Sequence, residues 1–509
     1  MQLPAELATW PAWTPGEEQL GELELLTSGA FAPLTGYLGA ADLATVSARG
    51  ELADGTPWPV PVTLTVPASA VPGDASRLVL QDQEGSPLAV VAITERSPAG
   101  PAGAMLRIAG PVTALREPEH GPFRALRATP ADVRAELGPD PVLGYATRRP
   151  LGRRQIGQLR HLAGQLRARI LLLPLIAGPA ELVPGPEALV RAVRAAAGQL
   201  PPGTRVVPVP LPPRADPAAE LAARAVVAAA YGATQLLTDA GDAGRGTRSR
   251  SDRGEFDLSK LGIEILAEPE WAYDPAAEVW RPLRLIEPGL ERGELSDAEL
   301  GELLDAGAEV PGWLMPAAVA AELRRGRPPR SARGLVVFCT GLSGSGKSTL
   351  ARDLRDALLE RGDRTVSLLD GDRVRRLLSA GLTFSREDRD LNIARIGYLA
   401  AEVARHGGIA ICAPIAPYAA ARGAVRQLVS EVGDFVLVHV STPLEVCEQR
   451  DRKGLYAQAR AGTIGSFTGI SDPYEEPDDA DLTIDTSVLS RRDAVAAVLA
   501  YLTRGGWLG

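Results

Sequence analysis

The stretch GLSGSGKST, residues 341–349, decides the fold of the C-terminal part of this chain. It reads Gly341, Leu342, Ser343, Gly344, Ser345, Gly346, Lys347, Ser348, Thr349 and fits the pattern G-x-x-x-x-G-K-[ST]. An apolar run, Leu335–Cys339, precedes it, and leucines at helical spacing from Leu350 to Leu358 follow it. We therefore expect a strand, a loop of small residues and a helix in this order.

This loop has the chemistry of a phosphate-binding site. Small residues let main-chain N–H groups and a helix N-terminus approach an anionic triphosphate. Lys347 adds a mobile positive charge, and the hydroxyl of Ser348 is suited to ligate Mg²⁺. A plain Gly/Ser turn between a strand and a helix needs neither the lysine nor the hydroxyl. The pattern therefore predicts a nucleotide site.

Two carboxylates indicate how the nucleotide is used. The second expected strand, Val366–Leu369, is followed by Asp370, Gly371 and Asp372, at the sheet edge where open α/β sheets bind their ligands. One carboxylate there is suited to accept a proton from an attacking hydroxyl, and the other to hold Mg²⁺ through water. The alternative is that Asp-Gly forms an ordinary turn.

Basic and aromatic residues follow these carboxylates. Arg389, Asn392 and Arg395 are spaced three apart, so all three lie along one face of an expected helix. Phe384 suits stacking on a planar base, and arginines such as Arg375 suit forked hydrogen bonds to an anionic group. These residues predict an acceptor that carries both a planar base and an anionic group. The alternative is a solvated basic helix face.

A second basic stretch, residues 450–462, follows the fourth expected strand, Phe435–Val440. Gly454 and Gly462 are suited to act as hinges. We expect a lid that brings positive charge over the phosphates when substrates bind. An ordinary exposed loop is equally compatible with the local sequence.

The composition bounds the class of protein. The chain has 509 residues, 45% hydrophobic and 23% charged, which is ordinary for a globular protein of about three domains. A net charge of -9 argues against nucleic acid as a bulk electrostatic partner. No secretion signal and no apolar stretch of roughly 18 residues is present, so we expect no membrane partner and a cytoplasmic location. The three cysteines, Cys339, Cys412 and Cys447, lie in apolar patterns and are expected to be reduced core residues.

Three domains are expected along the chain. Residues 1–135 mix short alternating runs with Gly, Pro and Asp turns, which is typical of a β-rich domain. Residues 136–330 alternate strands with Ala- and Leu-rich helices and end in a helical tail, 296–324, so an α/β domain is expected. Residues 324–330 suit an exposed hinge. Residues 333–509 then form an α/β domain with a parallel sheet covered on both faces.

The motifs of the last domain resemble those of adenylyl-sulfate kinase (APS kinase). They are, in order, GLSGSGKST, LDGDRVR, FSxxDRxxNIxR, PIAPY and CEQRDxKGLYxxARAGxIxxFTGI. The resemblance covers nearly all of residues 333–509 and implies a P-loop kinase fold. It also implies transfer of the γ-phosphoryl group of ATP to the 3′-hydroxyl of adenosine 5′-phosphosulfate (APS), which gives PAPS.

The resemblance also implies roles for individual residues. Residues 341–349 are expected to hold ATP and Mg²⁺, with Ser348 as the metal ligand, and the catalytic residues are expected to be Asp372, Asp370 and Lys347. The residues implied to line the acceptor pocket are Arg375, Phe384, Arg389, Asn392, Ile415, Lys453 and Phe467. One position departs from the pattern, because Ala416 stands where many members have a serine that could carry a phosphoryl group. Transfer is therefore expected to be direct.

The first 330 residues resemble ATP sulfurylase, the enzyme that makes APS. Residues 25–37 and 54–59 are similar to the β-rich (PUA-like) N-terminal domain of that family. The catalytic signatures fail: ATRRPLGRRQ, residues 146–155, stands where the family has a stretch like QTRNPLHRAH, so both histidines are missing. In the second signature, residues 238–246, Ala240 and Asp242 replace an arginine and a histidine. Arg148 is retained, but these changes make anion binding less favourable.

Three functions are compatible with these residues. The first is an APS kinase fused to an inactive sulfurylase-like half that serves as a scaffold, dimerisation element or regulatory pocket, in a homodimer or a higher homo-oligomer. The second is a bifunctional PAPS synthase with both activities. The third, a non-catalytic nucleotide sensor, has no need for the carboxylates Asp370 and Asp372.

Overall fold

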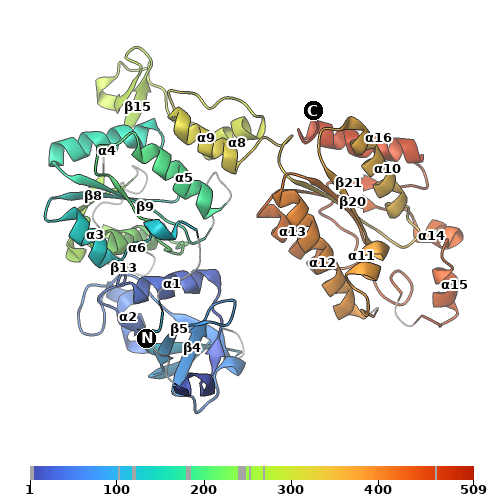
Figure 1. Ribbon diagram of the computed structural model, residues 1–509, viewed down its shortest axis with the longest axis horizontal. Coiled ribbons are helices and arrows are strands. Elements are labelled where there is room, and N and C mark those ends of the chain that lie inside the picture. The colour runs from blue at the N-terminus through green and yellow to red at the C-terminus, as the bar shows by residue number, and fades with distance from the viewer. Residues whose placement is uncertain are drawn as a thin grey trace. The chain divides into compact units, whose positions relative to one another are not determined.

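The computed structural model of the chain describes residues 5–100, 104–116, 122–178, 185–238, 248–251, 254–267, 270–383, 385–464 and 467–509. It divides into two compact units (Figure 1). Unit 1 comprises residues 1–300 and 310–326, and unit 2 comprises residues 301–309 and 327–509. Within the described residues, no helix is long and apolar enough to cross a membrane.

The N-terminal part of unit 1 is the expected β-rich domain. Its strands form one seven-stranded sheet in which β7 pairs with β5, β2, β3 and β6. The strands are β1 (Ala12–Trp13), β2 (Gly36–Tyr37), β3 (Leu64–Pro67), β4 (Arg77–Gln81), β5 (Pro87–Ala92), β6 (Glu95–Ala99) and β7 (Met105–Ala114), and the helices are α1 (Glu17–Thr27) and α2 (Ala40–Arg49). Alternation of apolar and polar residues in β3 places Leu64 and Val66 in the core.

The second part of unit 1 is an α/β domain with a parallel sheet in the order β10-β9-β8-β11-β14. The strands are β8 (Val142–Thr147), β9 (Arg169–Pro174), β10 (Arg205–Val206), β11 (Gln235–Thr238) and β14 (Glu264–Ala267). The helices are α3 (Pro130–Leu137), α4 (Arg153–Leu166), α5 (Pro186–Ala197) and α6 (Pro217–Ala230). Two antiparallel strand pairs complete the domain: β12 (Arg248–Ser251) pairs with β13 (Gly254–Asp257), and β15 (Trp271–Asp274) pairs with β16 (Val279–Pro282).

These two domains share one hydrophobic core. Leu25 and Val60 of the β-rich domain belong to the same buried cluster as Leu173 and Val226 of the α/β domain. This shared core explains why they form one compact unit.

The helical tail predicted at 296–324 is formed by two helices, α8 (Asp297–Asp305) and α9 (Ala317–Gly326). Pro311 and Pro316 lie between them and cannot donate the hydrogen bonds that a helix needs.

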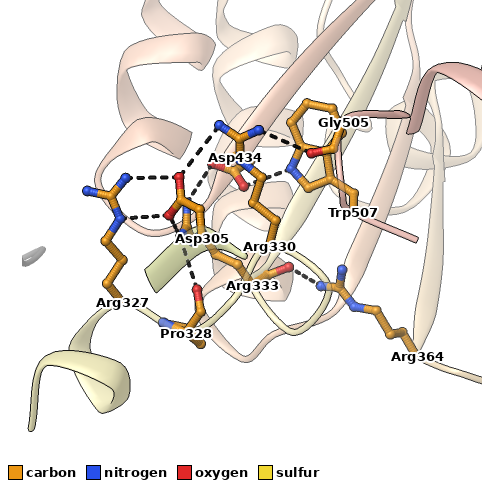
Figure 2. Close-up of polar contacts among 9 residues, drawn as sticks. All are labelled: Asp305, Arg327, Pro328, Arg330, Arg333, Arg364, Asp434, Gly505 and Trp507. Atoms are coloured by element: carbon orange, nitrogen blue, oxygen red, sulfur yellow. Dashed lines mark hydrogen bonds and ion pairs between the residues drawn. The ribbon is translucent and has the colours of Figure 1, made fainter. Parts of the chain in front are cut away.

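The predicted exposed hinge, residues 324–330, is exposed only at its start. Arg324 and Arg325 are exposed, whereas residues 326–330 are half-buried, and a polar cluster around Asp305 fastens this segment to unit 2 (Figure 2). Asp305 accepts hydrogen bonds from Arg327 and Arg333, and Arg333 also bonds Asp434 at 3.3 Å. Arg327, whose charge suggested solvent exposure, is therefore a partner of a partly buried carboxylate.

Unit 2 contains the expected parallel sheet, in the order β18-β19-β17-β20-β21. The strands are β17 (Leu335–Thr340), β18 (Val366–Asp370), β19 (Ile409–Ala413), β20 (Asp434–Val440) and β21 (Leu482–Ile484). The helices are α10 (Lys347–Arg361), α11 (Gly371–Leu377), α12 (Arg386–Arg405), α13 (Ala419–Ser430), α14 (Leu444–Arg450), α15 (Leu455–Arg460) and α16 (Arg491–Arg504).

Both faces of this sheet are covered, as the continuous apolar strands predict. Helices α10 and α16 pack on one face, and α12 and α13 on the other (Figure 1). All six residues of β17 are buried, which is the pattern of a central parallel strand. The three cysteines are buried and free, as expected. The loop 341–346 starts at the carboxyl end of this central strand.

Candidate active site

The phosphate-binding loop depends on glycine at two positions. Gly341 has φ +148°, and a Cβ atom there would lie 2.4 Å from the carbonyl oxygen of Val440. Gly346 has φ +104° and immediately precedes α10. Side chains at either position would be strained or would collide with main chain. The loop therefore turns tightly enough to present the N-terminus of α10.

Neighbouring strands hold this loop in place. The hydroxyls of Thr442 and Thr486 both donate to the carbonyl oxygen of Ser345, at 3.0 and 2.7 Å. On the other side, the buried Thr340 donates to the carbonyl oxygen of Ile415 at 2.6 Å. The loop is thus fixed by residues at the ends of β20, β21 and β19.

Lys347 lies inside the loop rather than in solvent. Its side chain is buried, and its Nζ donates to the carbonyl oxygen of Leu342 at 2.6 Å and to Oγ of Ser345 at 3.4 Å. Burial lowers the pKa of Lys347 from its ordinary 10.5 to about 8. An ammonium group held by one carbonyl oxygen and one hydroxyl is available to an incoming phosphate.

The two predicted carboxylates have different surroundings. Asp370 is the N-cap of α11, where its Oδ1 accepts from the amide of Asp372 at 3.1 Å. Asp372 is exposed and forms an ion pair with Lys453, which lies between α14 and α15. The cap aims Asp372 at the open edge of the sheet, whereas Asp370 itself does not line the cavity described below.

Helix α12 carries two of the predicted acceptor residues. Nη1 of Arg389 donates to the hydroxyl of Thr468 at 3.1 Å and to the carboxylate of Asp472. Asn392 is buried, and its Oδ1 has no hydrogen-bond partner among the described residues. The third residue of the predicted face, Arg395, instead donates to the carbonyl oxygen of Leu378 at 2.7 Å, so it stabilises the end of α11.

The predicted lid, residues 450–462, packs against neighbouring buried side chains through Tyr456. Tyr456 of α15 and Phe467 form a T-shaped ring pair with centroids 5.0 Å apart, in a small buried cluster with Cys447. Gly454 and Gly462 both have positive φ and flank α15. The phenolic hydroxyl of Tyr456 donates to the carbonyl oxygen of Ser343 at 2.8 Å. The stretch is therefore a structured element attached to the phosphate-binding loop.

One cavity of about 1170 Å³ joins most of these residues. At its nucleotide end it is lined by Ser343, Gly344, Gly346, Lys347, Ser348 and Thr349, and at its acceptor end by Asp372, Arg375, Arg389, Asn392, Ile415, Lys453 and Phe467. Gly341, Leu342 and Ser345 shape the loop from behind. Phe384 lies outside the described residues.

Sequence reasoning missed part of the nucleotide end. Thr486, Leu489 and Arg491 also line the cavity, together with Arg450 of the predicted lid. Nη1 of Arg450 donates to the hydroxyl of Thr486 at 2.8 Å. Thr486 and Leu489 lie in the loop before α16, Arg491 is the first residue of α16, and no motif links the three. Their only signal was that they follow the end of β21.

The stretch 146–155 in unit 1 is folded around internal ion pairs. Arg148 is buried: its Nε pairs with Glu220 at 3.1 Å, and its Nη atoms donate to the carbonyl oxygens of Ala177 and Leu211. Arg154 pairs with Glu294 at 2.7 Å. Arg149 pairs with Asp297, and Arg153 donates to a carbonyl oxygen. The second signature, residues 239–246, lies outside the described residues.

Comparison with known proteins supports the division of the chain into three successive domains. The chain matches a PUA-like domain over residues 1–99, the ATP-sulfurylase family over residues 124–326 and the adenylylsulphate kinase family over residues 333–485. It is 34% identical to sulfate adenylyltransferase of Phaeosphaeria nodorum, over 100% of this chain and 96% of that protein. The chain belongs to the sulfate adenylyltransferase family.

Other members of the sulfate adenylyltransferase family share the whole architecture. The protein of Aspergillus oryzae is 35% identical, over 99% of this chain and 96% of its own length. A solved structure described as hexameric APS kinase from Thiobacillus denitrificans is 35% identical with a TM-score of 0.79, over 99% of this chain and 95% of that one. Together with the kinase domain match, these similarities show an enzyme of the adenylyl-sulfate kinase class.

Proposed function

We propose that unit 2 phosphorylates the 3′-hydroxyl of adenosine 5′-phosphosulfate with ATP and releases PAPS. The observation that carries this proposal is one continuous cavity with Lys347 and Ser348 at one end and Asp372, Arg389 and Asn392 at the other. Phosphoryl transfer between two nucleotides requires both ends in one enclosure, because the acceptor oxygen and the terminal phosphorus must meet in line.

Asp372 is the residue that we assign as general base. It is an exposed carboxylate at the carboxyl edge of the sheet, between the phosphate-binding loop and α12. A carboxylate there would accept the proton of the attacking hydroxyl. Asp370 acts through it, because the cap bond to the amide of Asp372 fixes the start of α11. Lys453 keeps a positive charge beside the base.

The residues present fit a Mg²⁺ ion. Ser348 and Asp372 are hard oxygen donors and both line the cavity. Mg²⁺ at nucleotide sites is held by one or two protein oxygens, phosphates and water, so a cluster of three acidic residues is not needed. The described residues contain no such cluster. When bound, Mg²⁺ would neutralise charge on the transferred phosphoryl group.

The acceptor end suits an adenine nucleotide with a sulfated phosphate. The unpartnered Oδ1 of Asn392 would be satisfied by a hydrogen-bond donor such as an exocyclic amine. Arg375 and Arg389 supply positive charge for the phosphosulfate, and Phe467 supplies an aromatic surface for the base.

Transfer to this acceptor is direct in the proposed reaction. Ala416 has no hydroxyl and is almost fully buried in the apolar layer between the sheet and α12. No covalent intermediate can therefore form on its side chain. The γ-phosphoryl group passes straight from ATP to the ribose oxygen.

We further propose that unit 1 lacks sulfurylase activity. Both histidines of the first signature are absent, and the arginines of that stretch are already bonded to Glu220, Glu294, Asp297 and main-chain oxygens. Arg148, Arg149 and Arg154 thus each have a carboxylate partner without an external anion. The solved relative that matches over almost the whole chain is described as an APS kinase.

A bifunctional PAPS synthase is the second candidate, and the names of the fungal relatives favour it. Three incubations with purified full-length protein separate the candidates. PAPS formed from ATP, Mg²⁺ and APS supports the kinase, and its absence contradicts it. APS formed from ATP and sulfate, or ATP formed from APS and pyrophosphate, would establish the second activity.

A homo-oligomer is the proposed quaternary state. The Thiobacillus denitrificans relative is described as hexameric and covers 99% of this chain. Sedimentation velocity of the full-length protein tests this proposal directly. A single monomeric species would contradict it.

A further inference from the structure

Two side chains of the lid bond the phosphate-binding loop: Nη1 of Arg450 donates to the carbonyl oxygen of Gly344 at 3.4 Å, and Tyr456 makes the shorter and more buried contact. Tyr456 is 3% exposed, and its hydroxyl donates to the carbonyl oxygen of Ser343 at 2.8 Å. Its ring lies in the cluster formed by Cys447 and Phe467, with Leu342 packed against it. The lid therefore contacts both the main chain and a side chain of residues 342–343.

The main chain at Leu342 also contacts Lys347. Nζ of Lys347 donates to the carbonyl oxygen of Leu342 at 2.6 Å, and this is the ammonium group expected to bind the phosphates of ATP. When the ammonium turns to a phosphate, the carbonyl of Leu342 loses its donor. The peptide between Leu342 and Ser343 is thus the part of the loop that responds to nucleotide.

The other side of Tyr456 leads to the acceptor end. Its ring meets the edge of Phe467 at 77°, and the carbonyl oxygen of Phe467 accepts from the amides of Ser471 and Asp472, both at 3.1 Å. Asp472 in turn holds Arg389 and accepts from the hydroxyl of Tyr418 at 2.8 Å. A continuous set of contacts therefore runs from Lys347 to the predicted acceptor residues.

We propose that Tyr456 is a positioning residue that couples nucleotide occupancy of the phosphate-binding loop to the affinity of the acceptor end. The proposal rests on the function proposed above. Tyr456 acts through Ser343 and Phe467 and transfers no proton or phosphoryl group. By linkage, nucleotide tightens APS binding by the same factor by which APS tightens nucleotide binding.

The Tyr456→Phe substitution isolates the hydroxyl. It keeps the ring in the apolar cluster and the edge contact with Phe467, and it removes the hydrogen bond to Ser343 together with the contact of the hydroxyl with the Cys447 thiol. Tyr501→Phe is the matched control, because Tyr501 of α16 stacks on Trp507 and lies outside the cavity. Any general effect of removing a tyrosine hydroxyl from this unit would appear in both variants.

Isothermal titration of the full chain with APS, with and without a non-hydrolysable ATP analogue and Mg²⁺, measures the coupling. We expect APS to bind more tightly with the analogue in the unaltered chain and in Tyr501→Phe. In Tyr456→Phe the ratio of the two dissociation constants should fall about fivefold, as expected for one neutral hydrogen bond. The affinity for the analogue alone should stay within about twofold.

A second readout does not depend on APS. Hydrogen exchange should show that the analogue alone protects amides of residues 467–472 in the unaltered chain, and that Tyr456→Phe loses this protection. The proposal is overturned if the coupling ratio, or the protection of residues 467–472, is equal in the unaltered chain and in Tyr456→Phe. The proposed function would still stand in that case, provided that the protein forms PAPS. Failure of APS to bind with or without analogue would overturn both.

Discussion

Asp305 and Arg327 form a two-bond ion pair, with Nε to Oδ1 at 2.8 Å and Nη2 to Oδ2 at 3.0 Å (Figure 2). The same carboxylate accepts from Arg333, and Arg330 lies 3.6 Å away. Asp305 is the last residue of α8, whereas its partners follow α9. The carboxylate therefore fastens two separate passages of the chain to unit 2.

The first prediction concerns the stability of unit 2. Asp305→Asn leaves the guanidinium groups of Arg327 and Arg333 without their shared anion. The free energy of unfolding of unit 2 should therefore fall by about 2 kcal/mol at neutral pH. Chemical denaturation followed by hydrogen exchange of the amides of β17 and β20 measures it, because six of the seven tryptophans lie in unit 1. Asp363→Asn, which breaks the exposed pair with Arg361, is the control and should change stability by less than about 1 kcal/mol. Equal effects would contradict the prediction.

The pH dependence of this contribution has a definite sign. Asp305 is partly desolvated, which opposes ionisation, but the hydrogen bonds from Arg327 and Arg333 outweigh this and lower its pKa from 3.8 to about 2. Its contribution is therefore complete above about pH 4 and is lost as the pH falls toward 2. Acid titrations of stability should be steeper for the unaltered chain than for Asp305→Asn in that interval.

The second prediction concerns the proposed base. Asp372→Asn should lower PAPS formation by at least about a hundredfold, because an amide cannot accept the proton. The dissociation constant for ATP, from isothermal titration, should change by less than about threefold. Asp370→Asn is the matched control, because an asparagine oxygen still caps α11, and its loss of rate should be smaller. Unchanged turnover in Asp372→Asn would overturn the assignment.

The third prediction concerns the ion pair between Arg389 and Asp472. Asp472→Asn removes the charge that holds Nη1 of Arg389 beside Thr468, so KM for APS should rise about tenfold while kcat stays within about threefold. Steady-state kinetics with APS as the varied substrate measure this split. Asp479→Asn breaks an exposed pair with Arg426 and should leave both constants unchanged. An effect confined to kcat would assign Asp472 a different role.

Local sequence predicted the parts of the kinase fold that depend on local chemistry. The strand, glycine loop and helix around Lys347 were confirmed, because their residues interact with near neighbours along the chain. The apolar run at 205–209 is typical of a buried strand, but the structure has a strand only at Arg205–Val206. Pro208 has no N–H to donate to the ladder, although the amides of Val207 and Val209 continue the pairing at 2.9 Å each.

Contacts between distant segments were not predictable. Asp472 lies 83 residues from Arg389, and Tyr456 lies 113 residues from Ser343. A carboxylate or a tyrosine in a lid sequence carries no sign of its partner. The same holds for Asp305, whose arginine partners suggested an exposed hinge because charge usually indicates solvent. The roles assigned to the cavity residues stay predictions until they are tested.

The fourth prediction tests whether Arg148 is structural or binds an anion. Arg148→Ala would leave Glu220 partly buried beside Arg224 alone and remove the donors to Ala177 and Leu211, so unit 1 should lose about 3 kcal/mol of stability. Arg149→Ala, which breaks an exposed pair with Asp297, should cost less than about 1 kcal/mol. PAPS formation per folded molecule should be unchanged in both, since neither side chain belongs to unit 2. Thermal unfolding with and without sulfate completes the test: if sulfate stabilises the unaltered chain but not Arg148→Ala, the arginine binds the anion and its assignment as a structural residue is wrong.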